Sequence, residues 1–288
     1  TTLRVSAAAT FGSKAWGYGN EGQLGDGVFR TGSPYGSATA VSVNAPPDVI
    51  AVSAGSGHSI GLKSDGTVLA WGDNSLGQLG DGTRNNSANP VQVKGIGGAG
   101  FLTNVTAISA GRSHNLALLT NGSVVAWGFG QYGQLGDGTF YTGNPFASLT
   151  PVQVKNVGGS GTLTGVVSIA AGAAANHSLA LKADGSVLAW GYGNYGQLGD
   201  DTFYTSGNQG VATPIQVKGV SGVGNLSAAA IYAGGNHSVA LRPDGTVVAW
   251  GYGYYGQLGD GTYHQSGNLG VATPVQVKGI GGSGTLTA

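Results

Sequence analysis

The sequence contains no cysteine and no methionine among its 288 residues. Without cysteine, disulfide bonds, thiol catalysis and thiolate metal sites are all excluded. Charge is scarce as well, because charged residues make up 8% of the chain and the 12 basic residues balance the 12 acidic ones. A nucleic-acid-binding protein normally carries a basic patch or stripe, and this sequence has none. We therefore expect no nucleic-acid partner.

Long apolar stretches are also missing. A membrane-spanning helix needs a run of about 18 or more apolar residues, and no such run occurs in the sequence. Low charge, together with abundant glycine and small polar residues, is typical of secreted bacterial surface proteins. On this composition we expect an extracellular or cell-surface location and no membrane span.

What the sequence does contain is one phrase repeated five times. It reads Trp-Gly-Tyr-Gly-Tyr-Tyr-Gly-Gln-Leu-Gly-Asp-Gly-Thr from Trp250, and variants of it begin at Trp16, Trp71, Trp127 and Trp190. These five residues are all the tryptophans of the chain, and they follow one another at intervals of 55, 56, 63 and 60 residues. A period of this size indicates a repeat architecture.

Each repeat contains the signals of four short strands. An Asp-Gly or Asn-Gly pair stands between two alternating apolar runs, as at Asp184 and Gly185, and this is the strongest short hairpin signal. A Pro-Val-Gln-Val run, as at 151–154, predicts a third strand that begins at its proline. A run of small apolar residues, such as 167–172, predicts the fourth. Because four strands repeated radially are typical of a propeller blade, we predict an all-β fold, a β-propeller of four-stranded blades with five visible repeats in one domain, residues 1–288.

The repeated phrase carries a family resemblance. Preceded by an Asn-His-Ser-x-Ala-Leu strand and an Asp-Gly turn, it resembles the repeat of the regulator of chromosome condensation family, and we interpret the chain as a bacterial-type member. The resemblance covers about residues 40–288 well and the first 15 poorly. It implies a β-propeller, usually of seven blades, so five repeats are a departure. The best-known member is a nucleotide-exchange factor for a small GTPase that also binds chromatin, and one related propeller type inhibits β-lactamases.

The two ends of the chain are the irregular part of the pattern. The repeat of Trp16 is short of about one strand, and a sheet that lacks a strand exposes unpaired backbone groups that attract another strand. We expect residues Thr1 to Ala7 to close the ring by pairing within the first blade. The alternative is that a neighbouring copy or a flanking segment adds the strand, and addition by a copy would give self-assembly through the chain ends.

Four histidines stand at the same place in four repeats, namely His58, His114, His177 and His237. One histidine per blade leaves the rings too far apart to share a metal unless all point into the central channel. We therefore interpret them as structural residues that tie blade to blade by hydrogen bonds, and the five tryptophans as structural residues too.

Catalytic and cofactor motifs give no positive signal. Most aspartates fall in turns, where the side chain bonds its own backbone, and no repeat shows the paired carboxylates of acid–base catalysis. A Gly-x-Gly-x-x-Gly pattern occurs in four of the phrases, but without the following helix that a dinucleotide site needs. We expect no enzyme activity, no metal and no cofactor.

The candidate binding surface is the loop that follows each tryptophan. In four repeats this loop carries the same five-residue extension, rich in aromatic and amide residues. Equivalent loops of a propeller emerge on one face, where exposed aromatic side chains can anchor a protein or stack on sugar rings. The alternative is that these side chains pack over the glycine-rich turn of their own blade. The candidate residues are Phe140, Tyr141, Asn144, Tyr195, Phe203, Tyr204, Asn208, Tyr255, Tyr263, His264 and Asn268.

These observations predict a non-catalytic extracellular binding or structural propeller, as part of a surface protein, adhesin or fibre, with a protein or a glycan as its partner. The first alternative is a carbohydrate-binding lectin that uses the extension loops. The second is a guanine-nucleotide exchange factor-like or enzyme-inhibitor propeller.

Overall fold

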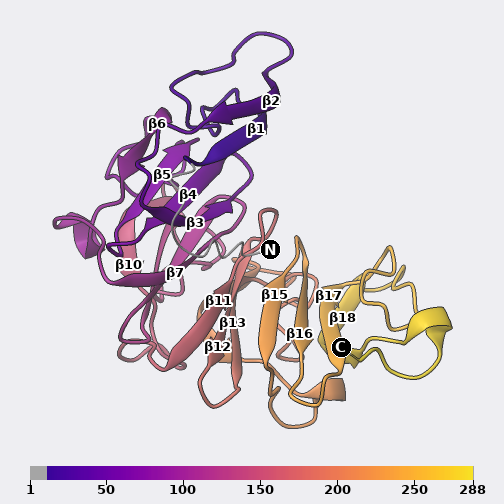
Figure 1. Cartoon of the computed structure of the whole chain (residues 1–288). Coiled ribbons are helices and arrows are strands. Elements are labelled where there is room, and N and C mark those ends of the chain that lie inside the picture. The colour runs from indigo at the N-terminus through magenta and orange to yellow at the C-terminus, as the bar shows by residue number, and fades with distance from the viewer. Residues whose placement is uncertain (1–11, 288) are drawn as a thin grey trace.

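The protein is described here by a computed structural model of residues 12–287. Apart from three short 3-10 turns, its regular elements are β-strands, and they form five antiparallel sheets (Figure 1). The first sheet pairs β1 (Lys14–Tyr18) with β2 (Gly36–Ser42), and each of the other four has four strands. We refer to the sheets as blades one to five in chain order. The predicted all-β propeller with four-stranded blades and five repeats is confirmed.

Each of the later blades consists of four consecutive strands, paired in sequence order. Blade two contains β3 (Val49–Ala54), β4 (His58–Lys63), β5 (Val68–Gly72) and β6 (Ser87–Gln92). Blade three contains β7 (Val105–Ala110), β8 (His114–Leu119), β9 (Val124–Phe129) and β10 (Ala147–Gln153). Blade four contains β11 (Val166–Ala170), β12 (His177–Lys182), β13 (Val187–Tyr192) and β14 (Gly210–Gln216). Blade five contains β15 (Ala230–Ala233), β16 (His237–Leu241), β17 (Val247–Tyr252) and β18 (Gly270–Gln276). The 3-10 turns are η1 (Ile96–Gly98), η2 (Val220–Gly222) and η3 (Ile280–Gly282).

The Asp-Gly pairs lie at the predicted hairpin turns. In blade four, Oδ1 of Asp184 accepts hydrogen bonds from the backbone N–H and the hydroxyl of Ser186, at 2.9 and 2.6 Å. Gly185 has φ of 84°, a left-handed conformation that glycine adopts without strain. This turn therefore joins the second and third strands of blade four as an antiparallel hairpin, as the repeat predicts.

The last strand of each blade is longer than its Pro-Val-Gln-Val pattern predicts. β14 begins at Gly210, before Pro214, and its register with β13 is interrupted between Ala189 and Gly191. The sequence predicts that the strand begins at its proline, and this is wrong, because the proline lies inside the strand. It is tolerated there because this strand is at the edge of its sheet, where a missing N–H breaks no ladder.

Apolar side chains fill the spaces between successive blades. Between blades four and five, Leu179, Leu181 and Val187 on one side pack with Val248 and Trp250 on the other in one buried cluster. Two further clusters join blades two and three and blades three and four, and a smaller one joins blades one and two. Burial of one large apolar side chain is worth about 1.5–3 kcal/mol, so the stability of this fold lies largely between its blades.

The blades follow one another along an open arc, with β1 and β2 at one end and β17 and β18 at the other (Figure 1). Contacts between the first strands of neighbouring blades, such as β7 with β11 and β11 with β15, place these strands on the inner edge of the arc. The expected five-bladed ring is therefore not formed by residues 12–287. The expected pairing of residues Thr1 to Ala7 lies outside the described residues.

Candidate interaction surface

A similar set of polar groups holds the three junctions between blades two to five. Between blades three and four, the indole N–H of Trp190 and the hydroxyl of Ser178 both donate to the backbone O of Gln134, at 2.9 and 3.0 Å. Nε2 of His114 lies 2.9 Å from the same hydroxyl oxygen. The pattern recurs with Trp127, Asn115, Gln78 and His58, and with Trp250, Ser238, Gln197 and His177. The histidines at the three junctions that involve blades two to five therefore link neighbouring blades.

Burial keeps these junction histidines neutral. The rings of His58, His114 and His177 are almost inaccessible to solvent. Because the charged form would lose its hydration, burial lowers the pKa of His58, and it lowers the pKa of His114 and of His177 to about 3. A neutral ring with one N–H and one bare nitrogen suits a hydrogen bond to a hydroxyl or an amide oxygen.

Two of the repeated residues differ from their counterparts. Trp16 is 69% exposed, whereas Trp71, Trp127, Trp190 and Trp250 are at most 3% exposed. The interpretation of all five tryptophans as structural residues thus does not extend to Trp16, which lies in the two-stranded blade one. His237 is only partly buried, and within residues 12–287 its ring makes no side-chain hydrogen bond.

Three of the candidate binding residues are packed within their own blades. The hydroxyls of Tyr141 and Tyr204 donate to Oδ2 of Asp137 and Asp200, at 2.8 and 2.6 Å. In blade five, Nε2 of His264 lies 2.9 Å from Oδ2 of Asp260. Burial and the neighbouring carboxylates raise the pKa of both tyrosines. Each ring lies over the glycine-rich turn, as the packing alternative expects.

A glycine makes room for each of these rings. A Cβ atom on Gly193 would lie 2.6 Å from Cδ2 of Tyr204, and Gly253 stands in the same relation to His264. In blade two, which lacks the extension, Asn74 replaces this glycine and fills the space itself. Its side-chain amide donates to Asp81, Thr83 and the backbone O of Asn85. The extension and the glycine therefore form one packing unit.

The remaining candidates of the extension loops lie further out. Phe140 and Phe203 are half-buried, Tyr263 is 69% exposed, and the three asparagines Asn144, Asn208 and Asn268 are exposed. Arg84 of blade two donates to Oδ1 of Asn144 at 3.2 Å. These residues are free to meet a partner, and their role as a binding surface stays a prediction.

The other two candidates, Tyr195 and Tyr255, belong to a row of rings that crosses three blades. We call it the aromatic row, and its members are Phe129, Tyr132, Tyr192, Tyr195, Tyr252, Tyr254 and Tyr255. Consecutive ring centroids are 4.8–6.3 Å apart. Most pairs are tilted or edge-to-face, which is the preferred geometry. Burial beside its neighbours raises the pKa of Tyr192 to about 12.

The row forms because rings pair across the junctions. Tyr132 of blade three meets Tyr192 of blade four at 4.8 Å, and Tyr195 of blade four meets Tyr252 of blade five at 4.9 Å. Tyr192 and Tyr252 end the third strands of their blades, and Tyr132 and Tyr195 lie in the loop that follows, so all four share one face of the propeller. The last three repeats each have aromatic residues at two equivalent positions, but only the stacking of blades brings the second ring of one repeat onto the first ring of the next.

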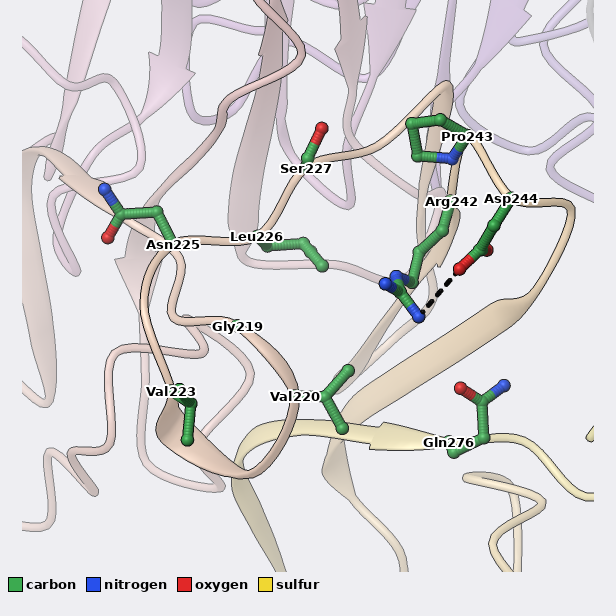
Figure 2. A pocket seen from close by; sticks show the side chains of 10 residues that line it. All are labelled: Gly219, Val220, Val223, Asn225, Leu226, Ser227, Arg242, Pro243, Asp244 and Gln276. Carbon is green, nitrogen blue, oxygen red and sulfur yellow. Dashed lines mark ion pairs between the residues drawn. The ribbon is translucent and has the colours of Figure 1, made fainter.

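A hollow of about 500 Å³ lies on the opposite face, between the η2 loop and the hairpin turn of blade five (Figure 2). Arg242 and Asp244 form an ion pair there at 3.1 Å. Such a partly exposed pair is worth about 0–1 kcal/mol. Asn225 and Gln276 lie on different sides of the hollow in Figure 2, so its polar groups are spread around the rim and do not converge.

Neither a metal centre nor a membrane helix is found in the described part of the chain. Residues 12–287 hold no group of three or more histidine or carboxylate side chains placed to bind a metal ion. Over the same residues, no helix has the length and apolar character to cross a membrane.

The chain is similar to several regulatory proteins. It is 31% identical to the human E3 ubiquitin-protein ligase HERC2 over 272 residues, which cover 93% of this chain and 5% of HERC2. It is 33% identical to the ultraviolet-B receptor UVR8 of Arabidopsis thaliana, over 77% of this chain and 46% of the receptor. Prp20p of Saccharomyces cerevisiae has the same fold, with a TM-score of 0.67 and 24% identity over 85% of this chain and 54% of Prp20p. The chain thus spans about half the length of UVR8 and of Prp20p.

These relatives correct the expected location and role. HERC2 is a ubiquitin ligase, and Prp20p is described with its binding to Gsp1p and histones. Ubiquitin ligation takes place inside cells, so the expected extracellular location and the adhesin or fibre module are wrong. The relatives come from human, plant and yeast, and they support neither a bacterial source nor a glycan partner. Composition misled because the scarcity of charge and the abundance of glycine follow from the tightly packed repeat, whatever the compartment.

The family assignment rests on a match over almost the whole length of the chain. The pattern of the RCC1-like domain matches residues 13–287, and the four complete blades all contain its tryptophan, glycine-rich turn and Asp-Gly or Asn-Gly hairpin. This protein therefore belongs to the family of RCC1-like β-propellers.

Proposed function

We propose that this chain is a protein-binding module of a regulatory protein, and that it binds its partner through the face that carries the aromatic row. The observation that carries the proposal is the continuity of that row across blades three, four and five. Tyrosine is one of the residues most enriched at the centres of protein interfaces, because its ring adds contact area and its hydroxyl remains able to hydrogen-bond.

The packing of the row favours tight binding. Each ring already rests against its neighbours and is half-buried, except Tyr255, which is 74% exposed. A side chain that is held in place before binding loses little conformational entropy when a partner arrives. The exposed asparagines of the extension loops, Asn144, Asn208 and Asn268, stand in the loops beside the row and supply adaptable hydrogen bonds at its rim.

A small GTPase is the sharper candidate for the partner. The family and the fold shared with Prp20p, which is described with its binding to Gsp1p, support an exchange factor-like role over the alternatives. The chain would act by binding, because its hairpin aspartates are engaged in turns. Oδ1 of Asp65, for example, accepts from the backbone and hydroxyl of Thr67 at 2.9 and 2.6 Å.

The test uses two defined probes, nucleotide-free Gsp1p and purified core histones. Their affinity is measured by biolayer interferometry for the native chain and for a variant with Tyr132→Ser and Tyr195→Ser. The matched control is Tyr232→Ser, because Tyr232 is 61% exposed on β15, away from the row. We expect the row variant to bind at least about tenfold more weakly and the control to bind as the native chain does. The release rate of labelled GDP from Gsp1p tests the exchange role.

Two results would overturn the proposal. One is the absence of binding to both probes. The other is a row variant that is folded by circular dichroism and binds with unchanged affinity. Binding without faster GDP release would retain the binding module and remove the exchange role.

A further inference from the structure

We infer that the aromatic row binds a proline-rich segment of the partner, held in the extended polyproline II conformation. The inference rests on the proposed role of the row as a protein-binding surface, and it names the kind of segment that the row itself contacts. It is carried by the rings at the junction between blades three and four and at the junction between blades four and five.

The surface around the row is almost free of charge. Three segments carry the rings and contain only aromatic, glycine and amide residues, namely 129–134, 192–197 and 252–257. The turns between the first and second strands lie beside the rings, since the N–H of Tyr192 donates to the backbone O of Asn176 at 2.9 Å. In blades three to five these turns contain a single charged residue, Arg112. Such a surface gives little attraction to nucleic acid or to a strongly charged peptide, so it favours an uncharged segment.

The row offers hydrogen-bond donors that the blades do not use. The hydroxyls of Tyr141 and Tyr204 each donate to an aspartate of their own blade. Among residues 12–287, the hydroxyls of Tyr132 and Tyr252 have no such partner, and a tyrosine hydroxyl can donate to a carbonyl oxygen. A polyproline II segment leaves its carbonyl groups free, because it forms no internal hydrogen bonds and proline has no N–H. The row and such a segment are therefore complementary in their hydrogen bonding.

Other ways of binding a peptide fit this surface less well. An amphipathic helix lays its apolar face into a hydrophobic groove, and the segments 129–134 and 192–197 contain no aliphatic side chain larger than glycine. Strand addition needs a free sheet edge, but the rings stand at or just after the ends of third strands, which are paired on both sides. Polyproline II segments instead dock on aromatic side chains, and their preformed conformation keeps the entropic cost of ordering low.

The spacing of the rings fits one turn of such a segment per blade. From Tyr132 through Tyr192 to Tyr195, the ring centroids advance by 4.8 and 6.1 Å, so the repeat of the row cannot exceed the sum of these two steps. One turn of polyproline II helix takes three residues and advances about 9 Å, which lies within that limit. The ring planes are inclined by 54° and 75°, so neighbouring rings do not cover each other's faces as parallel rings would. Prolines three residues apart would rest on successive junctions.

The experiment measures the binding of fluorescently labelled decaproline to the chain by anisotropy, up to a protein concentration of about 1 mM. Two peptides of the same length are the controls. One alternates glycine with serine and is flexible, and the other repeats Glu-Ala-Ala-Ala-Lys and favours a helix. We expect decaproline to bind at least about tenfold more tightly than either control.

Substitutions separate the rings from their hydroxyls. Tyr132→Phe and Tyr252→Phe keep the ring and should each weaken decaproline binding by roughly two- to tenfold. The variant with Tyr132→Ser and Tyr195→Ser loses two rings and should bind at least about tenfold more weakly. The matched control is Tyr232→Phe, because Tyr232 is 61% exposed on β15, away from the row, and it should bind as the native chain does. Circular dichroism checks that each variant is folded.

Three results would overturn the inference. Decaproline does not bind, either control peptide binds as tightly, or the folded variant with two serines binds decaproline with unchanged affinity. If Gsp1p or histones bind through the row and decaproline does not, the inference fails while the protein-binding module stands. Decaproline binding through the row, with no binding of Gsp1p or histones, would keep the peptide site and reject the proposed regulatory partners.

Discussion

Replacement of a junction tryptophan by alanine should destabilise the protein far more than the same change at Trp16. Trp190 is fully buried, and its indole N–H donates to the backbone O of Gln134 at 2.9 Å. Truncation of a buried tryptophan leaves a cavity and costs about 3–5 kcal/mol. The oxygen of Gln134 still accepts the hydroxyl of Ser178 at 3.0 Å, so no buried acceptor is left unpaired and the cavity accounts for most of the loss.

Trp16 supplies the internal reference for this prediction. With 69% of its surface exposed, its removal should change the free energy of unfolding of the monomer by less than about 0.5 kcal/mol. Guanidinium unfolding followed by circular dichroism at low protein concentration measures both variants. Because repeat proteins can unfold in parts, tryptophan emission should be recorded in parallel. The reasoning is refuted if the two variants lose the same stability to within about 1 kcal/mol.

Three further predictions concern the packing of the blades. His114 and His177 have folded pKa values of about 3, below the unfolded value of about 6.5, so the unfolded state takes up protons first and stability is lost as the pH falls from about 6.5 towards 3. At pH about 5 the loss should be about 2 kcal/mol for each ring, and unfolding midpoints that do not move between neutral and acidic pH would contradict it. Gly193→Ala should cost about 1–3 kcal/mol because its Cβ would collide with the ring of Tyr204, whereas Gly143→Ala, with open space around it, should be nearly neutral in thermal unfolding. Tyr204→Phe removes one partly buried hydrogen bond of 2.6 Å from the tyrosine hydroxyl and should lower the free energy of unfolding in urea by about 0.5–1.5 kcal/mol. An unchanged urea midpoint would contradict this prediction.

The sequence by itself determined the blades of this protein. The repeat of Trp71, Trp127, Trp190 and Trp250, the Asp-Gly turns and the alternating runs between them are local signals, because a hairpin depends on residues that are close in the chain. The spacing of one histidine per repeat led to the interpretation of blade-to-blade links, and His58, His114 and His177 each make a hydrogen bond to the next blade. The location could not be derived in this way, because composition reflects the packing of the repeat more than the compartment.

Only the tertiary structure decided how the blades meet. The partners of the histidines, such as Ser178 for His114, stand 64 residues away in sequence, and the row of rings joins each repeat to the next. The structure also divided the extension loops into rings that pack on their own glycine, such as Tyr204, and residues left exposed, such as Tyr263. It showed that Trp16, which begins a variant of the same phrase as four buried tryptophans, is exposed. A motif specifies the conformation of its own segment, whereas burial depends on which surface lies opposite it, and that surface comes from another blade.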